Sequence, residues 1–168
     1  YMTKDISSKG LLELYRKMHF PKSPKTAIKL STGETGSNYL RPEFIRPLVD
    51  YTHGTIVECN TAYDGERSET DSHEKLIQDH GFDTISDVVI LDAYEDLTIP
   101  VTNGYHLEES YIGAGIEDFN SIIVLSHFKG QAMAGFGGAL KNLSMQVEAG
   151  FILQVDSQKV LKVIQMNF

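Results

Sequence analysis

The sequence has little of what disulfide-rich, membrane and nucleic-acid-binding proteins depend on. It holds one cysteine, Cys59, in 168 residues, so no internal disulfide can form, and no Cys/His spacing resembles a zinc or iron–sulfur motif. No apolar run approaches the roughly 18 residues of a membrane span, and the first 20 residues lack a signal-peptide core. Lys and Arg number 15 against 23 Asp and Glu, and the net charge of −8 argues against nucleic-acid binding. These absences favour a cytoplasmic protein with neither a membrane nor a nucleic acid as its partner.

The apolar residues that are present predict strands alternating with helices. The expected strands are 26–31, 55–59, 87–92 and 121–126, and the expected helices are 8–18, 42–51, 68–80 and a short one at 108–118. A hairpin is expected around Asn103-Gly104, and the apolar run at 87–92 is typical of a strand covered on both faces. This order predicts an α/β fold with a mostly parallel sheet flanked by helices. Such a three-layer arrangement is Rossmann-like, but the dinucleotide fingerprint is missing.

Polar residues and glycines gather where the predicted strands end. In open α/β sheets ligands bind outside the carboxyl ends of the strands, so we predict a site for a small anionic ligand there. Lysine and arginine suit a carboxylate or phosphate, while glycines let backbone N–H groups approach it. The predicted ligand-binding residues are Lys29, Thr32, Glu34, Asn38, Arg41, Asn60, Tyr63, Lys129, Gly135, Gly137, Gly138 and Asn142.

Two residues near the fourth strand are candidates for catalysis. His127 leaves a buried strand, and a histidine there can transfer protons or ligate a metal; the alternative is a histidine that holds the shape of the loop. Lys141 follows a glycine pair, and it is an anion contact, a nucleophile if desolvated, or a solvated lysine.

Other polar residues favour structural interpretations. The segment at 32–36 is either part of the site or only a turn, and the glycines at 113 and 115 are interpreted as a turn. His73 and His80 are expected on a solvated helix face. Cys59 is expected to be a packed small hydrophobe rather than a reactive thiol.

Several of these segments together resemble a family of unassigned function, DUF362. The resemblance rests on AIKLSTGETGSNYLRPEFIRPLVD, GTIVECNTAYDGERSET and IIVLSHFKGQAMAGFGGALKNLSM. It covers residues 1–145, predicted to be one α/β domain, whereas 146–168 is expected to be a divergent tail from a truncated or altered reading frame. Longer members pair this domain with a ferredoxin-like 4Fe-4S module, which the resemblance implies as a partner. This chain alone cannot ligate such a cluster with one cysteine.

A more distant similarity is to the nickel-pincer lactate racemase family. That family has an active-site His followed ten residues later by a Lys, across an AGF-Gly-Gly turn. The matching positions are Gln131 and Lys141, so the Lys is kept and the His is replaced. Glutamine is a poor nickel ligand and no general base, which places racemase chemistry in doubt.

Three functions follow as hypotheses. The first is the binding of a small anionic ligand or cofactor, associated in longer relatives with iron–sulfur electron transfer, with His127 as acid or base if a reaction occurs. The second is an enzyme with a nickel-pincer or related cofactor near Lys141. The third is a scaffold that only docks an iron–sulfur module.

Overall fold

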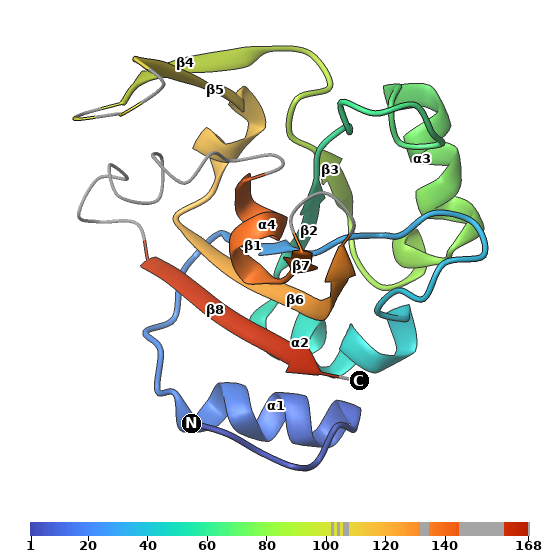
Figure 1. Cartoon of the computed structure of the whole chain (residues 1–168). Coiled ribbons are helices and arrows are strands. Elements are labelled where there is room, and N and C mark those ends of the chain that lie inside the picture. The colour runs from blue at the N-terminus through green and yellow to red at the C-terminus, as the bar shows by residue number, and fades with distance from the viewer. Residues whose placement is uncertain (102, 104, 106–107, 132–134, 145–159, 168) are drawn as a thin grey trace.

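The computed structural model describes residues 1–101, 103, 105, 108–131, 135–144 and 160–167, and its centre is a mostly parallel sheet (Figure 1). The strands of this sheet are β1 (Thr26–Lys29), β2 (Thr55–Glu58), β3 (Val88–Ile90), β6 (Ser121–Gln131), β7 (Gly135–Gly137) and β8 (Val160–Asn167). Their order is β3-β2-β1-β6-β7, and β8 also pairs with β6. Within this sheet, the described strand pairs are parallel except for β6–β7. The predicted α/β class and parallel sheet are therefore confirmed.

The strand β6 is longer than the sequence predicted. A loop was expected after residue 126, but the strand runs on to Gln131 and pairs Lys129 with Gly137 in a hairpin. β8, which lies within 146–168, runs parallel to β6 from Ser121 to Phe128. The loop prediction was wrong because β7 and β8 supply hydrogen-bond partners that the local pattern does not reveal.

The edge strand β3 also differs from its prediction. It has three residues, and its side chains are half-buried, exposed and buried in turn. Val89 is 36% exposed, so the strand is not covered on both faces. A continuous apolar run is therefore an unreliable sign of a central strand when the strand lies at the edge of the sheet.

The helices are α1 (Ser8–Lys17), α2 (Pro42–Thr52), α3 (Thr70–Asp79) and α4 (Ala139–Ser144), with short 3-10 turns at Phe82–Thr84 and Ala114–Asp118. The Ser7 side chain caps α1 by accepting a hydrogen bond from the Gly10 N–H. Pro42 begins α2, and Pro47 lies inside it without delaying its start. Pro47 has no N–H to offer the Glu43 carbonyl, and the Ser8 hydroxyl donates to that carbonyl instead at 3.4 Å. No helix in the described part of the chain is long and apolar enough to cross a bilayer.

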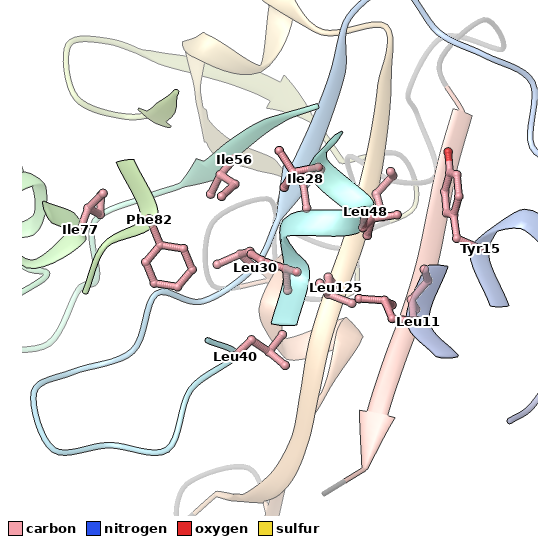
Figure 2. Close-up of a cluster of buried hydrophobic side chains, with 14 of the residues drawn as sticks. Leu11, Tyr15, Ile28, Leu30, Leu40, Leu48, Ile56, Ile77, Phe82 and Leu125 are labelled. Carbon is pink, nitrogen blue, oxygen red and sulfur yellow. The ribbon is translucent and has the colours of Figure 1, made fainter. Parts of the chain in front are cut away.

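Two buried clusters cover the two faces of the sheet. On one face, Ile28 packs with residues of α1 and α2 such as Leu11 and Leu48 (Figure 2). On the other face, Ala27 packs with Ile112 and with Leu143 of α4. Neighbours in β1 thus point to opposite faces, and each fully buried Leu or Ile contributes roughly 1.5–3 kcal/mol.

A second, two-stranded sheet shares no strand pairing with the main one and packs against it through Ile112 (Figure 1). It pairs β4 (Asp96–Pro100) with β5 (Glu109–Gly113) in antiparallel fashion. This agrees with the expected hairpin, whose turn includes Asn103 at φ 61°; Gly104 lies outside the described residues. The helix predicted at 108–118 was wrong over 109–113, where Ser110 and Ile112 are buried and Glu109 and Tyr111 are exposed, the two-residue period of a strand.

Candidate functional site

An open cavity of about 490 Å³ lies at the carboxyl edge of the main sheet. It is bounded by the segments that follow β1 and β2, by the extended end of β6 and by the β7–α4 segment. Its lining residues are Ser31, Gly33, Asn38, Tyr39, Leu40, Thr61, Tyr63, Arg67, Leu125, Ser126, His127, Lys129, Gly137, Gly138, Lys141 and Asn142. The segments converge here because β1, β2 and β6 are parallel and end at the same edge.

The charged side chains of this lining are all cationic. Arg67, Lys129 and Lys141 line the cavity, and no Asp or Glu does so among the described residues. The whole chain has a net charge of −8, so the charge of the cavity lining is opposite in sign to that of the protein. Arg67 is offset by Glu34 and Glu58, so Lys129 and Lys141 supply the net positive charge. Such a lining attracts anions.

Lys141 and Tyr63 meet across the cavity from segments far apart in the chain. The Lys141 Nζ donates to the Tyr63 hydroxyl at 3.2 Å and lies 5.8 Å from the centre of its ring. Tyr63 is 44% exposed, so the pair is reached by solvent. An anion can therefore contact the Lys141 ammonium from solvent without displacing any residue of the hydrophobic core.

His127 lines the same cavity from the end of β6. Burial lowers the pKa of the half-buried imidazole, and the nearby positive charge of Lys129 lowers it further, while a hydrogen bond to the Asn38 backbone acts in the opposite direction. The imidazole is thus neutral at neutral pH. The position of His127 is compatible with a role as acid or base, and equally with a structural role in which its hydrogen bonds hold the cavity lining in place.

Beneath the cavity lies a buried network centred on Glu58, whose side chain is 0% exposed. Lys29 Nζ donates to its Oε2 at 2.8 Å. The Thr32 N–H and the Arg67 Nη1 donate to its Oε1 at 2.8 and 3.2 Å. Burial alone would raise the pKa of Glu58, but the positive charges of Lys29 and Arg67 outweigh it and lower that pKa to about 2.

The network reaches the cavity wall by two routes. Arg67 Nε donates to Glu34 at 2.7 Å, and its Nη1 also donates to the Ser31 hydroxyl at 3.1 Å. Lys29 Nζ donates to the Asn142 side chain at 3.0 Å. Asn142 Nδ2 in turn donates to the Ser126 hydroxyl at 2.9 Å. The buried charges therefore fix the positions of Arg67 and Asn142, both of which line the cavity.

His73 in α3 and His80, which directly follows that helix, correct a prediction. His73 is 0% exposed, and its ring nitrogens lie 3.3 Å from Thr32 Oγ1 and 3.2 Å from Asn60 Oδ1. His80 is half-buried and bonds the Thr32 carbonyl at 2.9 Å. The prediction of a solvated face was wrong. His73 lies three and four residues before Leu76 and Ile77 and therefore shares their buried face, but the charged residues around it made the segment look exposed. Burial lowers the pKa of His73.

The segment after β1 makes close contacts with its neighbours. Gly33 has φ +78°, and a Cβ there would lie 2.6 Å from the Tyr39 side chain, so both the turn and the close approach require glycine. The Tyr39 ring stacks on His80 at 4.2 Å, and the Arg41 guanidinium lies 4.0 Å over the same ring. This segment is thus both a tight turn and a cavity wall.

The structure brings together most of the predicted site residues. Those that line the cavity are Asn38, Tyr63, His127, Lys129, Gly137, Gly138, Lys141 and Asn142. Those that do not line it are Lys29, Thr32, Glu34, Arg41, Asn60 and Gly135. Lys29 and Thr32 are instead buried in the network, and Arg41 lies on Tyr39.

Sequence reasoning missed Glu58 and Arg67. The available signal was a charged residue at the end of each of two short apolar strands, Glu58 in TIVE and Lys29 in TAIK. Cys59 is 1% exposed and burial raises the pKa of its thiol, as expected of a packed residue. No group of three or more metal-ligating His, Cys, Asp or Glu side chains occurs in the part of the chain that the structure describes.

Comparison with known proteins gives one match. The model of a family described as a domain of unknown function, DUF362, matches residues 26–152, which is more than half of the chain. No curated protein matches the sequence. No solved structure matches it either. The similarity to lactate racemase and the association with an iron–sulfur module thus stay predictions.

Proposed function

Because the chain belongs to the DUF362 family, whose description leaves its activity open, we propose a function from the cavity itself: the protein binds a small organic anion there. One observation carries this proposal. Arg67, Lys129 and Lys141 line the cavity, and none of its described lining residues is acidic. In a protein of net charge −8, a ligand-sized cavity with this lining favours a negatively charged ligand.

Neutral donors complete the anion site. Ser31, Ser126 and Asn38 line the same cavity and carry side-chain donors. Lys141 is our choice for the main contact, because its ammonium lies at the solvent-accessible mouth beside Tyr63. Arg67 contributes less, because Glu34 and Glu58 already occupy much of its donor capacity.

A matched pair of probes tests the role of charge. Naphthalene-2-sulfonate is an anion, and naphthalene-2-sulfonamide is its neutral counterpart of nearly the same shape. We expect calorimetric titration at pH 7 to show binding of the sulfonate and much weaker binding of the sulfonamide. Equal affinity for both would contradict the proposal.

The variant Lys141→Gln tests the assigned contact. A hydrogen bond to a charged group contributes about 1.5–3 kcal/mol, so we expect the affinity for naphthalene-2-sulfonate to fall roughly 10- to 100-fold. Lys75→Gln is the matched control, since Lys75 is exposed on α3 and does not line the cavity. Unchanged affinity in Lys141→Gln, with an unaltered circular dichroism spectrum, would remove the assignment.

A further inference from the structure

We infer that the ligand of this cavity is an amphiphilic anion. Its charged group is attached to an apolar or aromatic body of about ten non-hydrogen atoms, a size that fits the volume of the cavity. This inference rests on the proposed function and narrows it. It separates the site from one built for inorganic phosphate, acetate or another bare oxyanion.

The first reason is the size of the cavity. Its volume of about 490 Å³ equals that of about 16 water molecules at roughly 30 Å³ each. A bare oxyanion would occupy a small part of this space and leave the rest to water. Sites of this volume are typical of ligands of metabolite or cofactor size.

The second reason is the apolar surface within the cavity. Leu40 and Leu125 border it as members of the main buried cluster (Figure 2), but they are only 5% and 0% exposed and offer a ligand almost no surface. The cavity thus reaches down to the hydrophobic core. The apolar surface that a ligand can cover comes from the ring of Tyr39, which is half-buried, and the ring of Tyr63, which is 44% exposed. A ligand body that covered these groups would remove apolar surface from water.

The third reason is that the same lining presents both charge and apolar surface. The cations come from β6, α4 and the segment after β2, as Lys129, Lys141 and Arg67. The apolar surface comes from the rings of Tyr39 and Tyr63, in the segments that follow β1 and β2. An anion with an attached body can satisfy both sets at once, whereas a bare oxyanion satisfies only the cations.

Ligands that share a headgroup test this inference. Methanesulfonate carries the sulfonate without a body, and naphthalene-2-sulfonate carries it with one. We expect the aromatic sulfonate to bind about 100-fold more tightly, as burial of roughly 110 Å² of apolar surface would give. Its binding should also show a negative heat-capacity change, the mark of apolar burial.

The variant Tyr39→Ala adds a second test, because the Tyr39 ring lines the cavity and is only half-buried. It should weaken binding of naphthalene-2-sulfonate several-fold and leave the weak binding of methanesulfonate unchanged. Should this variant not fold, the comparison of the two ligands on the unaltered protein still decides the question.

The outcomes separate the two claims. If methanesulfonate binds as tightly as naphthalene-2-sulfonate, anion binding stands and the amphiphilic class is wrong. If neither sulfonate binds, or if the neutral sulfonamide binds as well as the sulfonate, the proposed function itself fails.

Discussion

Glu58 places a carboxylate in the interior at the end of β2, where no water can solvate it. An ion in such a place is tolerated only when other groups replace its hydration. Here the hydration of Glu58 is replaced by hydrogen bonds from Lys29, Thr32 and Arg67. Arg67 also lines the cavity, as does Asn142, which accepts a hydrogen bond from Lys29. At the scale of single residues, stability and the geometry of the site thus depend on the same carboxylate.

The variant Glu58→Gln should be strongly destabilised. It leaves Lys29 buried without its counter-ion, and breaking a buried ion pair costs about 3–5 kcal/mol. Urea unfolding at pH 7 measures this change in the free energy of unfolding. Glu74→Gln, at an exposed position of α3, is the control and should stay within about 0.5 kcal/mol. A loss below about 1 kcal/mol in Glu58→Gln would contradict the role of the network.

The pH dependence of this effect has a definite sign. The pKa of Glu58 is lowered to about 2 in the folded protein. Its stabilising contribution is therefore complete above the unfolded value of about 4.3, and is lost as the pH falls toward 2. The difference in stability between the unaltered protein and Glu58→Gln should shrink over that range. A difference that grew on acidification would show that the carboxylate is not held ionised by its neighbours.

His127 should give anion binding its own pH dependence. Burial and the charge of Lys129 lower the pKa of the free imidazole, and a bound anion would raise it. Affinity for naphthalene-2-sulfonate, which stays charged throughout, should rise up to about tenfold as the pH falls from 7 to 5. Titration calorimetry should show this rise in the unaltered protein and not in His127→Gln. The same rise in the variant would place the titrating group elsewhere.

At the scale of elements, the β4–β5 hairpin is joined closely to the main sheet at one point. A Cβ on Gly113, the last residue of β5, would lie 2.4 Å from the backbone carbon of Leu91, just after β3. Backbone cannot move aside as a flexible side chain can. The glycine that the sequence suggested as part of a turn is thus a site of close backbone contact.

A pair of alanine variants tests this contact. Gly113→Ala should lower the free energy of unfolding by about 1–3 kcal/mol, as overpacking does. Gly130→Ala is the matched control, because a Cβ at Gly130 meets nothing within 4 Å. It should stay within about 0.5 kcal/mol in the same urea titration. Equal effects in the two variants would show that the contact with Leu91 does not matter.

At the scale of the whole molecule, local patterns predicted the sheet but not its long-range partners. The apolar runs ending near Lys29, Glu58 and Leu125 marked three parallel strands and hence the edge where the cavity lies. The β6–β7 pairing was missed because it joins residues of two separate strands, and the periodicity within either strand does not reveal its partner. Lys29 was assigned to a ligand because its partner Glu58 is distant in sequence and no local signal joins the two.

The central claim is that one cavity holds both the charge and the body of an organic anion. A crystal structure of the protein soaked with naphthalene-2-sulfonate tests it most directly. We expect the sulfonate within hydrogen-bond distance of Lys141 and the naphthalene ring against the rings of Tyr39 and Tyr63. A sulfonate bound only elsewhere on the surface, with the cavity left to water, would contradict it.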